Sequence, residues 1–226
     1  DEAIGAGQKT LRKARAAVLW VPRGELDRVS EGGAHQGMAA RIQERPGQDL
    51  SGFLDGLSEQ QKSRTVLVAL DQIQDPQNFG AIARSAACFG AAALLYPERR
   101  SAPLSQAVLR ASAGAAVRIR SFCVGNLADA LRRLKDRGFW IYGAEMGGRP
   151  AWETRFNAPM VLVVGSEGTG IRTLVRSLCD DLVSIPQAQS GVESLNAASA
   201  AGILLYEVAR QAAGPAAGAR PGKPPP

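Results

Sequence analysis

From Thr65 onward, apolar runs alternate regularly with helical segments. Short β-type runs stand at residues 65–70, 92–96, 139–143, 160–164 and 182–185, with a weaker one at 117–119. Helical patterns lie near residues 79–89, 103–113, 127–137, 171–178 and 194–211, and Asn126 and Gly138 can cap and end the third of these. Continuously apolar strands that alternate with helices are typical of parallel sheets buried on both faces. The pattern therefore predicts an α/β domain at residues 65–211, with a mostly parallel sheet and helices on both faces.

Residues 1–64 differ from this pattern and carry too few apolar runs to close a core. Val18–Pro22 is typical of a strand that enters a loop, and residues 37–42 of a second short strand. We interpret residues 1–45 as part of a small N-terminal α/β domain or as an extension of the main domain. Residues 46–64 are expected to be a linker, Pro46–Ser51, and a short connecting helix, Leu54–Lys62. The Pro-, Gly- and Ala-rich tail at 212–226 cannot bury enough apolar surface to order itself, so we expect disorder there.

Composition narrows the classes of function. The chain has 226 residues, 45% of them hydrophobic and 21% charged, which is ordinary for a soluble globular protein. Apolar stretches such as Val66–Leu70 are far too short to cross a bilayer, and no secretory signal is expected. The net charge of +6 favours a polyanionic partner, because Lys and Arg neutralise phosphates.

Cysteine and histidine are scarce. The three cysteines, Cys88, Cys123 and Cys179, are widely spaced and form no CxxC pair, so neither a disulfide framework nor a metal site is expected. We interpret them as buried, reduced thiols, which favours a cytoplasmic protein. With His35 as the single histidine, histidine-based catalysis is not expected.

Three loops carry the candidate chemistry, and each follows a predicted strand. In Asp71–Arg84, Asn78 can cap the next helix and Arg84 would lie about one and a half turns in. Two interpretations explain this spacing equally well. The first is structural: Asn78 caps the helix and Arg84 is a surface arginine. The second is functional: Arg84 holds a phosphate or polarises a hydroxyl. In Gly165–Ile171, GSEGTGI, the spacing fits neither a Walker A loop nor GxGxxG. A generic tight turn explains its glycines, but not Glu167.

The third loop, Ser184–Ala198, is irregular and polar. Helix capping accounts for Ser194 or for Asn196, but not for both. Ligands of open α/β sheets bind outside the carboxyl ends of the strands. These loops therefore predict a small-ligand site beside a basic surface, and the residues alone leave its reaction open. The expected members of this site are Asn78, Arg84, Glu167, Ser194 and Asn196.

Taken together, the loops resemble three motifs of the SpoU (TrmH-like) branch of the SPOUT methyltransferases. The motifs read DPQNFGAIARSA (Asp75–Ala86), VVGSEGTGI (Val163–Ile171) and SIPQAQSGVESLNAASAAGILLYE (Ser184–Glu207), in the family order. The resemblance implies a C-terminal trefoil knot and a homodimer whose active site lies at the subunit contact. It also implies S-adenosylmethionine as cofactor, RNA as partner and no metal.

The same resemblance assigns roles to residues. Arg84 matches the catalytic arginine that assists deprotonation of a ribose 2′-hydroxyl, and Asn78, Glu167, Ser194 and Asn196 match the other polar positions. The implied cofactor contacts are Gly143, Ala144, Gly165, Ser166, Gly170, Ile185 and Leu195. Ala198 departs from the family pattern, which usually has a serine there, and we expect this to tune the site.

Glu25–Ile42 resembles the end of a small RNA-binding domain in bacterial ribosomal RNA members of the family. The resemblance therefore implies methylation of a guanosine ribose in 23S rRNA, with His35 in a structural or RNA-contact role. The alternatives are a transfer RNA ribose methyltransferase, a non-catalytic RNA-binding member of the fold, and an unrelated nucleotide-binding α/β enzyme. The glycine spacing disfavours the last.

Overall fold

The computed structural model describes residues 17–30, 35, 37–39, 49–188 and 194–214, and the chain divides into two compact units, Asp1–Gly47 and Gln48–Pro226. In the first unit, α2 (Arg23–Val29) follows an extended segment. The strand predicted at Val18–Pro22 is wrong, and residues 37–39 are not in a strand either, because no partner strand pairs with them among the described residues. Residues 40–42 lie outside the described residues.

His35 links α2 to the turn that follows it. Its Nε2 lies 2.9 Å from Asp27 Oδ1, and its Nδ1 accepts a hydrogen bond from Gly37 N at 3.0 Å. Both ring nitrogens are therefore engaged locally. This is the arrangement of a structural histidine.

The second unit is built on a six-stranded sheet. Its strands are β1 (Val66–Asp71), β2 (Ala93–Pro97), β3 (Arg120–Val124), β4 (Trp140–Pro150), β5 (Met160–Gly165) and β6 (Asp181–Ser184). Their order is β3-β2-β1-β5-β4-β6, and every neighbouring pair is parallel. The predicted parallel sheet is confirmed.

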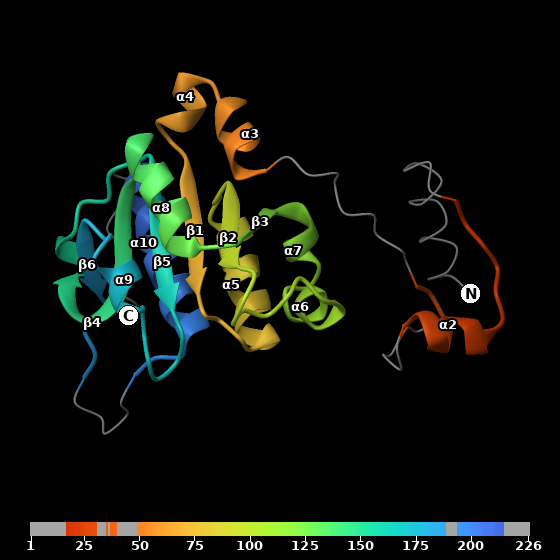
Figure 1. Ribbon diagram of the computed structural model, residues 1–226. Helices are drawn as coiled ribbons and strands as arrows, with labels where there is room; N and C mark the ends of the chain where they lie inside the picture. Colours follow the sequence, from red (N-terminus) through yellow and green to blue (C-terminus); the bar gives the residue numbers. More distant parts are fainter. Residues whose placement is uncertain (1–16, 31–34, 36, 40–48, 189–193, 215–226) are drawn as a thin grey trace, which may run out of the picture. The chain divides into compact units, whose positions relative to one another are not determined.

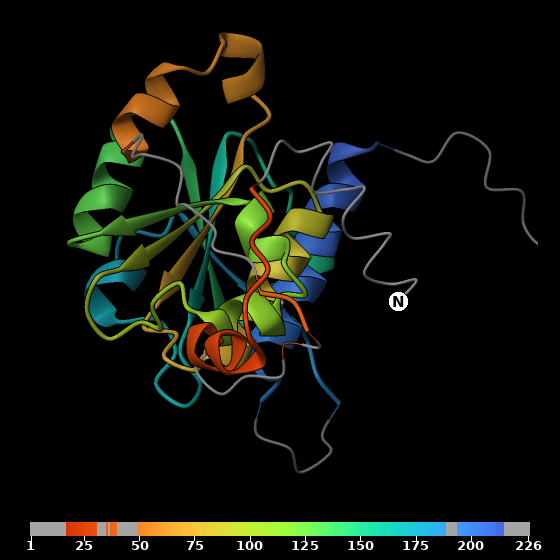
Figure 2. The same cartoon turned by 90° about the vertical axis from the view of Figure 1, so that its right-hand side faces the viewer.

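Helices cover both faces of the sheet (Figures 1 and 2). One buried cluster joins the sheet to α5 (Pro76–Cys88), α6 (Gln106–Ala111), α7 (Ala115–Arg118), η1 (Ala151–Glu153) and α10 (Ala197–Ala212). The other joins it to α3 (Leu50–Asp55), α8 (Leu127–Asp136) and α9 (Thr173–Arg176). Along β1, Val68 and Leu70 belong to the first cluster, and Leu67 and Ala69 to the second. This alternation places apolar side chains on both faces, so each face needs a helical layer.

The strand expected at 117–119 is wrong. Val117 and Arg118 end α7, and β3 begins only at Arg120. The run is too short to define a strand, and Ser112 Oγ accepts a hydrogen bond from Ala116 N at 3.2 Å, which supports a helical turn. Asn126 does cap α8 as predicted, since its side chain accepts from Ala128 N.

The segment before the sheet differs from its prediction. Leu50 and Ser51, expected in a linker, already belong to α3, which Asp49 caps through Gly52 N at 2.8 Å. The expected single helix is two helices, α3 and α4 (Glu59–Lys62), because Ser58 forms a capping box that starts a new helix. Phe53 and Leu54 are buried against the sheet.

The thiols were expected to be buried, and this is wrong for two of them. Cys88 and Cys123 are exposed, while Cys179 is partly buried, and none of the three forms a disulfide. Cys88 ends α5, and Cys123 lies on β3 at the edge of the sheet, where fewer elements cover it. Burial, together with Asp180 and Glu145, raises the pKa of Cys179 to about 12.

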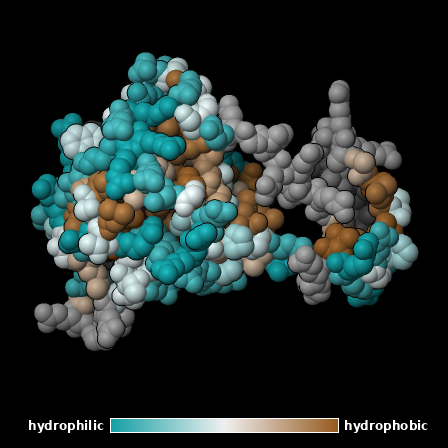
Figure 3. Space-filling model, viewed as in Figure 1, coloured by the Kyte–Doolittle hydropathy of each residue, from teal (hydrophilic) through white to brown (hydrophobic). Residues whose placement is uncertain are grey.

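The surface of the second unit is mostly hydrophilic on the side seen in Figure 3, with scattered hydrophobic residues. Across the part of the chain that is described, no helix is long and apolar enough to span a membrane.

Candidate functional site

Because all six strands are parallel, their carboxyl ends meet at one edge of the sheet. Asp71 at the end of β1 lies in register with Gly165 at the end of β5. The loops after β1, β5 and β6 therefore start from the same edge. These are the three loops that carry the candidate site residues.

Three of these residues, Asn78, Glu167 and Asn196, form one hydrogen-bonded cluster. Asn78 Nδ2 donates to Glu167 Oε1 at 3.0 Å, and Asn196 Nδ2 donates to Asn78 Oδ1 at 2.8 Å. Asn196 Nδ2 also donates to Glu167 Oε1. The cluster joins positions up to 118 residues apart in the chain. Each of the three motifs contributes one member.

Asn196 is both a helix cap and a member of this cluster. Its Oδ1 accepts hydrogen bonds from Ala198 N at 2.9 Å and Ser199 N at 3.1 Å at the start of α10. Its Nδ2 then faces Asn78 and Glu167. Capping therefore fixes the orientation of the amide that the site uses, so the structural and functional interpretations are compatible.

Asn78 was expected to cap α5, but Asp75 does so, accepting from Gln77 N at 2.9 Å with Pro76 as the first helical residue. Asp75 precedes a proline, whose fixed φ suits the first helical position, and this favours the earlier start. The Asn78 side chain is therefore available to Glu167. Arg84 lies about two turns into α5 rather than one and a half.

Arg84 and Ser194 do not join the cluster within the chain. Both are exposed, and neither makes a side-chain hydrogen bond or ion pair with the residues that the structure describes. Arg84 follows Asn78 by six residues, which on a helix corresponds to about 9 Å along the axis and about 120° around it. The arginine therefore points away from the side of α5 that faces Glu167.

The glycine-rich turn folds back tightly on the end of β5. Ser166 and Gly170 exchange backbone hydrogen bonds of 3.2 and 2.9 Å. A Cβ on Gly165 would lie 2.2 Å from the carbonyl carbon of Gly170, so only glycine fits there. Gly168 and Gly170 have φ values of +83° and +65°, which glycine adopts without strain. The turn thereby holds Glu167 at its outer side, where it meets Asn78.

Of the remaining cofactor candidates, Gly143 and Ala144 lie within β4, which continues to Pro150, and Leu195 precedes α10. Ala144 pairs with Val164 of β5 and Val183 of β6, and Ile185 directly follows β6. Gly143 is buried, and a Cβ there would lie 2.9 Å from both Cys179 Sγ and Leu182 Cδ2. Ile185 and Leu195 are partly buried.

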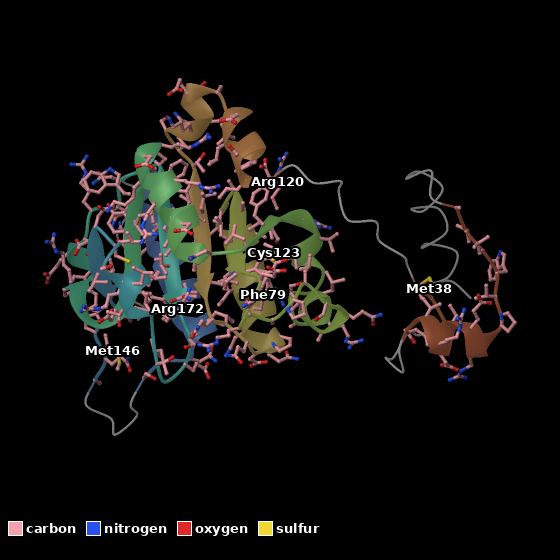
Figure 4. All side chains as sticks on the ribbon, viewed as in Figure 1. Met38, Phe79, Arg120, Cys123, Met146 and Arg172 are labelled. Atoms are coloured by element: carbon pink, nitrogen blue, oxygen red, sulfur yellow. The ribbon has the colours of Figure 1, made fainter. Side chains whose placement is uncertain are left out.

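A buried ion pair beside the turn was missed by the sequence analysis. Asp71, with 0% of its surface exposed, accepts hydrogen bonds from Arg172 N at 2.8 Å and Arg172 Nε at 2.7 Å. Arg172 Nη2 lies 2.6 Å from Asp71 Oδ1. Arg172 lies at the carboxyl edge of the sheet (Figure 4) and directly follows the glycine turn, so the pair fastens this turn to β1. The sequence signal that could have indicated this ion pair is the aspartate at the end of an apolar strand.

A parallel α/β sheet with three sequence-distant loops joined at its carboxyl edge is the usual arrangement of an α/β domain that binds a small ligand. Residues 65–206 match the SpoU rRNA Methylase family. Residues 5–47 match a second family, described as "RNA 2'-O ribose methyltransferase substrate binding". The chain thus belongs to the SpoU rRNA methylase family of S-adenosylmethionine-dependent RNA 2′-O-ribose methyltransferases, as its motifs predicted.

Relatives and solved structures agree with this family. An uncharacterized tRNA/rRNA methyltransferase of Mycobacterium ulcerans is 44% identical over 216 residues, which cover 93% of this chain and 67% of the relative. The SpoU methyltransferase AviRb of Streptomyces viridochromogenes, solved with AdoMet, has a TM-score of 0.66 and 29% identity over 74% of this chain and 66% of that one. A TrmH/SpoU tRNA-modifying enzyme of A. aeolicus has a TM-score of 0.59 and 28% identity over 66% of this chain and 76% of that one. The chain spans about two thirds of the length of the first two proteins.

Proposed function

We propose that this chain transfers the methyl group of S-adenosylmethionine to a ribose 2′-hydroxyl of RNA. The observation that carries the proposal is the closed set of hydrogen bonds among Asn78, Glu167 and Asn196. It positions polar groups from three distant motifs at the edge of the sheet where α/β folds bind ligands.

The residues around this edge fit the proposed cofactor. Ile185 and Leu195 offer partly buried apolar surface for a nucleobase. A Cβ built on Gly168 or Gly170 would meet no atom within 4 Å, so a ligand can approach their backbone. When bound, the cofactor supplies a methyl group activated by a positively charged sulfur. We propose Gly143, Ala144, Gly165, Ser166 and Gly170 as its backbone contacts, together with those two side chains.

The chain's own task is to align and deprotonate the hydroxyl, because an alcohol is a poor nucleophile at neutral pH. In this proposal Asn78, Glu167, Ser194 and Asn196 orient the ribose. Arg84, a cation that stays charged at all working pH values, holds the hydroxyl oxygen and stabilises the negative charge that develops on it as its proton passes to water.

We further propose that Arg84 acts across a homodimer contact, because it points away from the cluster of its own chain. Ile203 and Tyr206 of α10 are 44% and 55% exposed, and Tyr206 stacks edge-on against Phe89, which directly follows α5. These residues form an apolar surface beside the arginine-bearing helix. We propose that a second copy of the chain docks there and supplies its own Arg84 to this site. We propose that the C-terminal trefoil knot of the family also belongs to this chain.

The direct test measures transfer of radiolabelled methyl groups from S-adenosylmethionine to RNA. Arg84→Ala should lower turnover by at least about 100-fold while cofactor affinity, measured by calorimetry, stays unchanged. Arg133→Ala, an exposed arginine on α8, is the matched control and should retain full activity. Near-normal turnover by Arg84→Ala would remove this residue from the mechanism. A wild-type chain that binds RNA without methylating it would instead be a non-catalytic member of the fold.

Subunit mixing tests the position of Arg84. Arg84→Ala and Asn196→Ala should each be inactive alone. If one subunit supplies Arg84 to the Asn196 of the other, every mixed dimer has one intact site, so random mixing restores about a quarter of wild-type sites. If both residues serve the same chain's site, mixing restores nothing, and the proposed contribution across the dimer is wrong.

For the substrate we propose a guanosine of 23S rRNA, with residues 1–45 as part of an RNA-binding domain and the cytoplasm as the place of action. The match of residues 5–47 to a substrate-binding family and the net charge of +6 support an RNA partner. The tRNA-modifying neighbour keeps transfer RNA as the alternative. Mapping ribose methylation in cells that lack the protein decides between them, since the missing methyl group lies on one RNA class.

A further inference from the structure

A basic pocket occupies the other half of the carboxyl edge. It has a volume of about 300 Å³ and lies beyond the ends of β1, β2 and β3. The cofactor candidates Gly143 and Ala144 lie on β4 and Ile185 follows β6, on the other side of β5, and none of the cofactor candidates lines the pocket. The pocket is therefore separate from the proposed methyl-transfer site.

Three arginines, Arg99, Arg100 and Arg172, line this pocket, and no acidic residue does. Arg99 and Arg100 are exposed, and their side chains have no hydrogen-bond or ion-pair partner in the described part of the chain. Arg172 binds Asp71 through Nε and Nη2, which leaves further guanidinium N–H groups available. The pocket also borders the amino end of α8, whose dipole adds positive potential.

The loop that carries the arginines is held in place. Ala102 N donates to Ile73 O at 2.8 Å, and Ser101 Oγ donates to the same oxygen at 3.3 Å. These bonds tie the loop after β2 to the loop that leads to Asn78. Arg100 has a φ of +58° and Gln72, which also lines the pocket, a φ of +62°. Non-glycine residues rarely adopt this conformation, so the fixed loop holds both side chains at the pocket despite the strain.

We propose that this pocket binds a backbone phosphate of the RNA strand next to the methylated nucleotide. Forked guanidinium groups match phosphate oxygens in geometry and charge. The connection from Gln72 to Asn78 places the pocket beside the proposed ribose site, so one strand can reach both. The inference rests on the proposed function, because the RNA substrate supplies the phosphate.

The test uses the full chain and a fluorescein-labelled RNA hairpin, with affinity measured by anisotropy over a series of salt concentrations. Arg99→Ala/Arg100→Ala should bind the hairpin about tenfold more weakly. Its plot of log affinity against log salt should be shallower by about 1 to 2 units. Arg64→Ala is the control, since Arg64 is exposed just before β1 at the opposite edge, and it should leave the slope nearly unchanged. Cofactor affinity and unfolding temperature should remain at wild-type values in both variants.

A second arm identifies the phosphate itself. Neutral methylphosphonate linkages, placed one at a time along the hairpin, should weaken wild-type binding most at one linkage, and the double variant should lose this sensitivity. Equal affinity and slope for wild type and double variant, or no RNA binding by the wild type, would overturn the inference. Failure of the proposed function is a separate result, seen as absent methyl transfer while the salt slope of the double variant is still shallower than that of the wild type.

Discussion

The ion pair between Asp71 and Arg172 allows an asymmetric prediction about stability. Asp71 is fully buried at the end of β1, whereas the side chain of Arg172 is 41% exposed. Removing either partner breaks the same contact, but the group left behind differs. A buried carboxylate without its guanidinium is costly, while a half-exposed guanidinium is solvated by water.

The expected free energies follow from this difference. Arg172→Ala should lower the free energy of unfolding by about 3 kcal/mol, the lower end for a broken buried pair, because the backbone N–H of residue 172 still donates to Asp71 at 2.8 Å. Asp71→Ala should cost about 1 to 2 kcal/mol, since it removes the buried charge itself. The double variant should be more stable than Arg172→Ala alone.

Urea unfolding followed by circular dichroism measures these differences, provided that the slope against urea is unchanged. The matched control is Arg132→Ala, whose partner Asp129 lies 2.6 Å away in an exposed pair, and it should cost at most about 0.5 kcal/mol. Cofactor affinity should fall in Arg172→Ala, because the pair fastens the glycine turn to β1. If Asp71→Ala destabilises the protein more than Arg172→Ala does, or if Arg172→Ala costs no more than the control, the reasoning is refuted.

Two further predictions concern the turn and the thiols. Gly165→Ala should weaken cofactor binding at least about tenfold in calorimetry, because its Cβ would lie 2.2 Å from the backbone of the turn. The control is Gly24→Ala, where a Cβ meets no atom within 4 Å, and this variant should bind the cofactor as the wild type does. Equal cofactor affinity of the two variants would contradict the role of the turn. At pH 8, iodoacetamide should modify Cys179 much more slowly than the exposed Cys88, since burial raises the pKa of Cys179 to about 12 and little thiolate forms. Peptide mass spectrometry gives both rates, and similar rates would refute this explanation.

Hydrophobic patterning was sufficient to predict the parallel sheet, because most of its strands are short, continuously apolar runs that alternate with helices. It failed at residues 117–119, where three residues hold too little information to separate a strand from a helical turn. The prediction that Asn78 caps α5 also failed, because Asp75 and Pro76 start the helix earlier, and the hydrophobic pattern contains no information on capping residues.

The contacts of the site depend on strand order, which local sequence does not encode. Asp71 and Arg172 are 101 residues apart, and they meet because β5 lies next to β1. The three motifs identified the polar residues expected in the site. They did not indicate that Glu167 would face Asn78 while Arg84 pointed away on the same helix.

The pairing of β1 with β5 also constrains how the chain reaches its native state. Val66 pairs with Met160, so one side of β1 stays without its neighbour until synthesis has passed the fifth strand. Until then β1, β2 and β3 expose an open apolar edge, which is prone to intermolecular pairing. Contacts so distant in sequence slow folding, and we therefore expect ribosome-bound fragments that end before Met160 to require chaperones.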